Sequence, residues 1–206
     1  IAASFKKSSF IKGTDLTLLI KQVFSRAQNS RPAHFLEKTL IFLLSLKIIY
    51  VMFETLVKPV VGFDSFSHWS LKAKMIYLAG GLPRTEEFLR YFYGKHGDYP
   101  AHIQLLEGWL ATCLGGWHEN LIKIIFPLFF ICAIILIYSA LRRHKDRLQA
   151  LLFAFLFSSL PFVTYHASIE YADLPLGIYY SASVLFLYRF IEEKRTSFLI
   201  ISGVLL

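Results

Sequence analysis

Apolar runs long enough to cross a bilayer dominate this sequence and restrict what it can fold into. The first extends from Phe35 to about residue 60, and further runs cover residues 121–141, 148–165, 174–190 and 196–206. About 20 apolar residues span the hydrocarbon core, where helices pair their own backbone polar groups. The apolar content of 55% and the mean hydropathy of +0.51 also exceed ordinary soluble usage. The sequence therefore predicts an all-α, polytopic transmembrane helix bundle.

The boundaries of these runs divide the chain into two parts. Residues 1–34 are mixed and basic, and we expect a cytoplasmic or interfacial lead-in there, without a cleavable signal peptide. Residues 35–206 are expected to form the transmembrane domain, in which 196–206 is a truncated span. Because the chain opens on Ile1 and closes within an apolar run, we expect it to be the N-terminal piece of a longer protein.

Basic residues are dispersed among the apolar segments, and their placement predicts the topology. The connectors at 142–147 and 189–195 are rich in Arg and Lys, whereas the connector at 166–173 has neither. Since short cytoplasmic loops carry excess Lys and Arg, the basic connectors and the N-terminus are placed in the cytoplasm. We therefore expect the net charge of +8 to face anionic membrane lipids and not to bind nucleic acid. A multi-pass protein of the plasma (inner) membrane is expected.

This topology places the acidic residues of two loops on the opposite, extracytoplasmic face. The long loop at about 62–120 and the short loop before the fourth span would both lie there. Four carboxylates could then converge on one site: Asp64, Asp98, Glu170 and Asp173.

The long loop contains two predicted juxtamembrane helices. Apolar residues at helical spacing predict the first over Ser65–Leu78, and Ala101–Leu114 predicts the second. A short helical patch at 86–93 and a turn-rich segment at 94–100 lie between them. Asp64 stands at the expected N-cap, and Asp64, His68 and Lys72 follow at steps of four along one face. The alternative interpretation is an ordinary helix cap beside a solvated face.

The residue types in the long loop suit a general base, a phosphate site or a metal site. An exposed carboxylate can accept the proton of an oriented hydroxyl. Lys72, Arg90 and Lys95 are the cations considered for binding a phosphate. A divalent metal is possible at Asp64 with His68, or at Asp98 with His96 and His102, but neither spacing is diagnostic.

Lys47 lies near the middle of the first apolar run. An intramembrane cation is costly and is often functional. Snorkelling of its long side chain toward an interface is the alternative, and the sequence does not choose between them.

The order of these motifs resembles the GT-C fold glycosyltransferases. The resemblance rests on Asp64 after the first span, the first juxtamembrane helix, Asp98-Tyr99-Pro100 before the second, and Tyr171-Ala-Asp-Leu-Pro175 opening a later span. The chain is most similar to bacterial transferases that use lipid-linked sugars, related to lipid A aminoarabinose transferases and protein O-mannosyltransferases.

The resemblance implies transfer of a sugar from a polyprenyl-phosphate carrier to an extracytoplasmic acceptor, with inversion. Asp64 would be the catalytic base and Asp173 the acidic residue of the next external loop. Asp98 and Tyr99 would lie in the segment that binds the carrier phosphate, where Ala101 replaces a proline common in relatives. The substrate-binding set is Asp98, Tyr99, His68, Lys72, Lys95 and Arg90. A non-enzymatic transporter or assembly subunit is the alternative, although no internal repeat supports a transporter.

Overall fold

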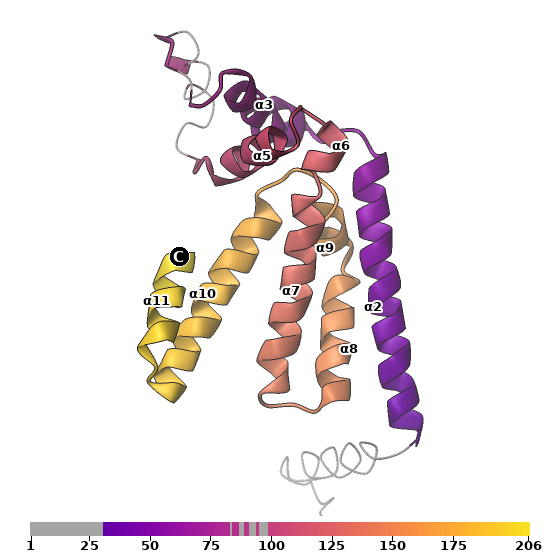
Figure 1. Ribbon diagram of the computed structural model, residues 1–206. Coiled ribbons are helices and arrows are strands. Elements are labelled where there is room, and N and C mark those ends of the chain that lie inside the picture. The colour runs from indigo at the N-terminus through magenta and orange to yellow at the C-terminus, as the bar shows by residue number, and fades with distance from the viewer. Residues whose placement is uncertain (1–30, 83, 87–88, 91–93, 95–98) are drawn as a thin grey trace, which may run out of the picture.

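The computed structural model describes residues 31–82, 84–86, 89–90, 94 and 99–206, and these form helices joined by turns (Figure 1). The long helices are α2 (Arg31–Val57), α7 (Ile125–Arg142) and α10 (Asp173–Glu193). Shorter helices complete the bundle: α8 (Arg147–Ser158), α9 (Pro161–His166) and α11 (Thr196–Leu205). A layer at one end holds η1 (Ser65–Trp69), α3 (Ser70–Leu78), α5 (His102–Cys113) and α6 (Glu119–Ile122). The predicted all-α membrane bundle is confirmed.

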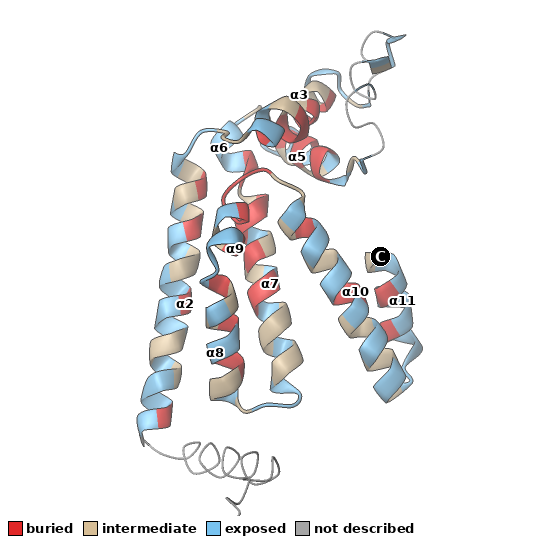
Figure 2. Ribbon diagram, turned by 180° about the vertical axis from the view of Figure 1, so that it is seen from behind, coloured by how far each residue is buried: buried red, intermediate tan, exposed pale blue. Residues whose placement is uncertain are grey.

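Three segments are long and apolar enough to cross a membrane: Pro32–Val57, Glu119–Arg142 and Asp173–Glu193. Their outward faces carry large exposed side chains such as Phe42 and Tyr180, and Figure 2 shows exposed residues along the outer sides of α2 and α10. Such faces suit contact with lipid, because hydrocarbon solvates apolar side chains.

The expected span at 148–165 is not one helix. Its first part is α8. Asp146 is the N-cap of this helix, and its side chain accepts a hydrogen bond from the Gln149 N–H at 2.8 Å. The helix ends before Leu160, and Pro161 then starts α9 at its first position. Proline fits a first turn but interrupts the hydrogen-bond ladder of a helix interior, which explains the division.

Two apolar clusters hold the bundle and the end layer together. The first joins α2, α7, α8 and α9 through residues including Val51, Phe130 and Ala154. The second joins the end layer to the start of α7 through Trp69, Ile103, Ile125 and Phe126. Close packing of this kind fixes the end layer relative to the spans.

The two acidic loops lie at the same end of the bundle. Figure 1 shows α3, α5 and α6 beside the 167–172 connection, while the basic connectors after α7 and α10 lie at the opposite end. The predicted grouping of the loops is therefore present in the structure. On α2, the Lys47 ammonium lies 5.7 Å from the Tyr50 ring, a cation–π contact within its own helix that leaves both interpretations of Lys47 open.

Candidate active site

Asp64 lies on the turn that joins α2 to the end layer. Its carboxylate is exposed and makes no capping hydrogen bond, although the residue occupies the N-cap position of η1. The cap interpretation is therefore not supported for this side chain. A wide π turn follows, in which the Ser70 N–H donates to the Ser65 carbonyl. Such turns are frequent at functional sites, where they redirect side chains.

His68 and Lys72 do not share the exposed position of Asp64. Only 5% of His68 and 2% of Lys72 are exposed, so the solvated-face interpretation is wrong for both. The physical reason is the π turn, because its extra residue rotates the later side chains relative to Asp64. Their part in substrate binding stays a prediction.

Tyr99 brings the segment before α5 to the first-loop helix. Its ring stacks on Trp69 at 5.8 Å between centroids with planes 13° apart, and it meets His68 edge-on at 5.4 Å. Tyr99 is 44% exposed despite these ring contacts. Asp98 and Lys95 lie outside the described residues, as does His96, and Arg90 is exposed.

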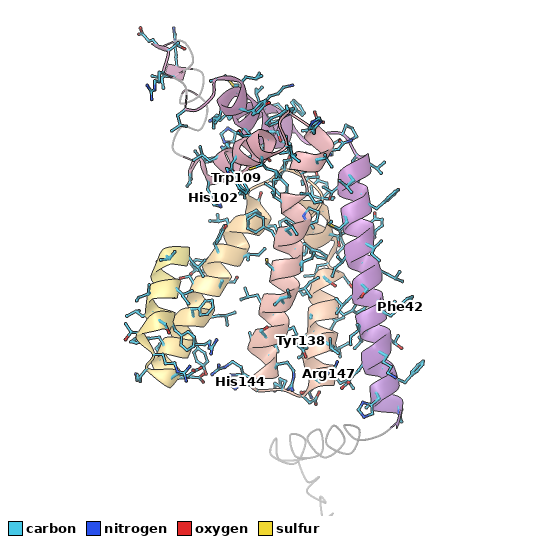
Figure 3. The ribbon with its side chains drawn as sticks, in the orientation of Figure 1. Phe42, His102, Trp109, Tyr138, His144 and Arg147 are labelled. Atoms are coloured by element: carbon cyan, nitrogen blue, oxygen red, sulfur yellow. The ribbon has the colours of Figure 1, made fainter. Side chains whose placement is uncertain are left out.

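His102 has a structural partner on α10. Its Nε2 lies 3.0 Å from the Tyr179 hydroxyl, and Figure 3 places His102 and Trp109 on the side of α5 that faces α10. Among the described residues no group of three His, Cys, Asp or Glu side chains could hold a metal ion. The possible divalent metal therefore has no complete ligand set in the part of the chain that is described.

Tyr171 connects the two acidic loops. The Asp64 N–H donates to the Tyr171 hydroxyl, whose pKa is raised by burial and by the nearby charges of Asp64 and Asp173. Asp173 is exposed, and its Oδ2 lies 3.7 Å from Nδ1 of the buried His166. Burial lowers the pKa of His166, opposed by that carboxylate. The structure therefore brings the Asp64 and Asp173 loops together around one tyrosine.

Glu170 turns away from this surface into a buried polar cluster. Its carboxyl is 1% exposed and lies 3.9 Å from the Lys123 ammonium, which is 2% exposed. Glu107 of α5 is fully buried and accepts a hydrogen bond from the Ser70 hydroxyl at 3.2 Å. The expectation that Glu170 joins the exposed carboxylates is wrong, because its side chain pairs internally with a buried cation.

Burial and repulsion determine the charge state of this cluster. Burial raises the pKa of Glu107 to about 8, the charge of Glu170 adds to the effect, and the Ser70 hydrogen bond opposes it. Burial also raises the pKa of Glu170, with Lys123 opposing. Glu107 therefore holds its proton at neutral pH, which leaves Glu170 as the carboxyl beside the Lys123 ammonium.

Comparison with known proteins shows which proteins this chain is similar to. A family model described as dolichyl-phosphate-mannose-protein mannosyltransferase matches residues 106–206. The dolichyl-phosphooligosaccharide-protein glycotransferase 2 of Archaeoglobus fulgidus is 25% identical over 114 residues, which are 54% of this chain and 19% of that relative. Both similarities are to glycosyltransferases, and they support a GT-C-like interpretation of this chain. No solved structure matches it.

The chain spans about a fifth of the relative's length, and the family match covers only part of the site. Asp173, Glu107, Lys123 and Glu170 lie within the match, whereas Asp64 precedes it. Sequence reasoning missed the burial of Lys123 and Glu107 and the contact of Tyr171 with Asp64. A weak signal was present, since Lys123 directly precedes a long apolar run and Glu107 interrupts the apolar residues of α5.

Gly62 permits the close approach of Tyr171. Its φ is +95°, and a Cβ would lie 2.9 Å from the Tyr171 hydroxyl oxygen. We expect Gly62→Ala to destabilise the fold by about 1–3 kcal/mol through backbone strain and to displace the tyrosine. Thermal unfolding and sugar transfer by the purified full-length protein would measure both effects. Gly80→Ala is the matched control, since Gly80 has φ +68° with nothing within 4 Å. Equal loss of transfer in both variants would contradict a specific Gly62–Tyr171 contact.

Glu107 is expected to make stability depend on pH. Its folded pKa of about 8 exceeds the ordinary value of 4.5, so the folded state binds more protons between these values. Stability should therefore fall as the pH rises through this window, by up to about 1.4 kcal/mol per pH unit. Glu107→Gln should flatten the dependence of the unfolding temperature measured from pH 5 to 8, whereas the exposed Glu86→Gln should not. A Glu107→Gln variant with the wild-type dependence would refute this assignment.

Proposed function

We propose that the full protein transfers a sugar from a polyprenyl-phosphate carrier to an acceptor at the extracytoplasmic membrane face, with inversion. The observation that carries the proposal is the exposed, uncapped Asp64 beside the loop that bears Asp173, joined to it through Tyr171. Asp64 precedes η1 and Asp173 begins α10, and these helix starts lie at the end of the bundle opposite the basic connectors (Figure 1). The family and the relative are both described by dolichyl-phosphate-linked sugars.

Asp64 acts in this proposal as the base that receives the proton of the acceptor hydroxyl. The acceptor oxygen forms a bond to the anomeric carbon while the bond from that carbon to the phosphate oxygen breaks. The electron pair leaves with the carrier phosphate, which is a stable anion, so a cation can replace a general acid. One carboxylate on the face opposite the leaving group is then sufficient for inversion. Asp173 assists by orienting the acceptor.

The carrier phosphate would be held by the segment around Tyr99 and by cations of the long loop. Arg90 is exposed, while Lys72 is only 2% exposed, so Lys72 acts on the phosphate only at a distance. Asp98, Lys95 and a possible divalent metal complete the proposal from the sequence. His68 supports Tyr99 through its ring contact.

The donor class tests this function directly. Full-length protein in vesicles should consume a polyprenyl-phosphate-linked hexose or pentose and release polyprenyl phosphate, but should leave nucleotide sugars intact. Mass spectrometry of the extracted lipids gives both quantities. Consumption of a nucleotide sugar without a carrier lipid would contradict the proposal.

The membrane side of the site is open to a separate test. In a protein whose Cys113 and Cys132 are replaced by serine, Asp64→Cys and Asp173→Cys should react with a membrane-impermeant maleimide added to intact cells. Lys145→Cys lies at the opposite end of the bundle and should react only after the cells are opened. Labelling of Lys145→Cys in intact cells, with Asp64→Cys protected, would reverse the proposed orientation.

A further inference from the structure

Lys123 touches both segments that surround Asp64. Its ammonium donates a hydrogen bond to the Lys58 carbonyl, just beyond the end of α2, and lies 3.9 Å from the Glu170 carboxylate. Lys58 is six residues before Asp64, and Glu170 is three residues before Asp173. One buried cation therefore connects the chain leading into the first acidic loop with the chain leading into the second.

Other contacts hold the same segment along its length. One turn before Lys123, the exposed Glu119 accepts a hydrogen bond from the Val60 N–H at 2.9 Å. After Asp64, the Ser65 hydroxyl donates to the Glu170 carbonyl at 3.2 Å. The residues from Lys58 to Ser65 are thus held at both ends by α6 with its following turn and by the second acidic loop.

A buried ion pair is a costly way to stabilise a fold. Lys123 and Glu170 both lose their hydration, and apolar residues of similar volume often replace such pairs without loss of stability. An apolar residue, however, could not donate to the Lys58 carbonyl. The polar contacts of Lys123 therefore fix the distance between the segment at Lys58 and the segment at Glu170, which apolar packing alone would not do.

We propose that Lys123 is a positioning residue for Asp64, acting together with Glu119 and Glu170. By holding residues 58–60 against α6 and against the second acidic loop, it sets the place of the Asp64 carboxylate relative to Asp173. Displacement of a catalytic group by about 1 Å can cost roughly 100-fold in rate. This inference rests on the proposed role of Asp64 as the base.

The decisive variant removes both buried charges at once. Lys123→Met combined with Glu170→Gln leaves neither a buried cation nor its unpaired partner, so folding should be retained. The donor to the Lys58 carbonyl is nevertheless lost. We expect kcat for transfer from a polyprenyl-phosphate-linked sugar to fall at least about 10-fold, with KM little changed. If the double variant unfolds at the wild-type temperature and also has the wild-type kcat, the pair is only structural and the proposal is overturned.

A second variant avoids any risk to folding. Glu119 is exposed, so Glu119→Ala should leave the unfolding temperature unchanged while releasing the Val60 N–H. Glu119→Ala should lower kcat, as the double variant does. Asn120→Ala, at the neighbouring exposed position of α6, is the control and should behave as wild type. A wild-type kcat in Glu119→Ala would also count against the proposal.

A geometric readout separates this inference from the proposed function. Asp64→Cys and Asp173→Cys are introduced together, with Cys113 and Cys132 replaced by serine, and joined by a short bis-methanethiosulfonate. Cross-linking should be efficient in this background and fall several-fold when Glu119→Ala is added. If the wild-type protein transfers no sugar but cross-linking responds to Glu119→Ala, the function fails and the positioning holds. If transfer occurs and cross-linking is unchanged, the positioning fails alone.

Discussion

Asp64→Asn is expected to lower kcat for sugar transfer by roughly 10²–10⁴-fold, the range contributed by a positioned general base. Asparagine has the same shape but cannot accept the acceptor's proton. The Asp64 carboxylate is exposed and has no capping hydrogen bond, so the substitution should leave folding and membrane insertion intact. Transfer by equal amounts of folded full-length protein in vesicles would measure the effect.

Asp146→Asn is the matched control for Asp64→Asn. Asp146 caps α8 through the Gln149 N–H at the opposite end of the bundle, and asparagine caps helices about as well. This variant should transfer sugar at the wild-type rate. A similar loss in both variants would show that the assay reports general damage and not removal of a base.

Lys123→Met alone is expected to destabilise the protein by about 3–5 kcal/mol, the largest stability effect we anticipate. Removing the cation leaves the Glu170 carboxylate, which is 1% exposed, without its charge partner. Glu107 cannot compensate, because its carboxyl is fully buried and holds its own proton at neutral pH. Unfolding of the purified protein in detergent, followed by circular dichroism, would measure the change.

The control for Lys123→Met is Lys145→Met, an exposed lysine in the turn after α7. Exposed charges contribute little to stability, so this variant should be as stable to unfolding as the wild-type protein. Adding Glu170→Gln to Lys123→Met should restore most of the lost stability. Equal stability of Lys123→Met and wild type would mean that the buried pair is not formed in solution.

The sequence predicted the membrane bundle because hydrophobic length and loop charge are properties of single segments. The run from Phe35 and the basic connectors predicted membrane-length helices and the grouping of the acidic loops at one end, as in Figure 1, although the span expected at 148–165 is divided into α8 and α9. The expected juxtamembrane helix at Ser65–Leu78 is present as η1 followed by α3, and Ala101–Leu114 as α5. Local periodicity was sufficient for these elements.

The buried polar residues could not be predicted in the same way. Whether Lys72, Glu107, Lys123 or Glu170 faces water depends on contacts between segments that are far apart in sequence. The π turn after Asp64 changes the helical phase, so a face inferred from steps of four was misassigned at His68 and Lys72. Contacts between distant segments therefore determine the burial of the side chains that local sequence patterns do not predict.

The central claim is that this site moves a sugar from a lipid carrier with Asp64 as the base. Full-length wild-type protein and Asp64→Asn would be reconstituted at equal amounts with a polyprenyl-phosphate carrier bearing a radiolabelled sugar, and the label remaining on the carrier would be counted over time. We predict that wild type removes the label and that Asp64→Asn leaves it in place. Label that stays on the carrier with wild type, or leaves it equally fast with Asp64→Asn, would contradict the account.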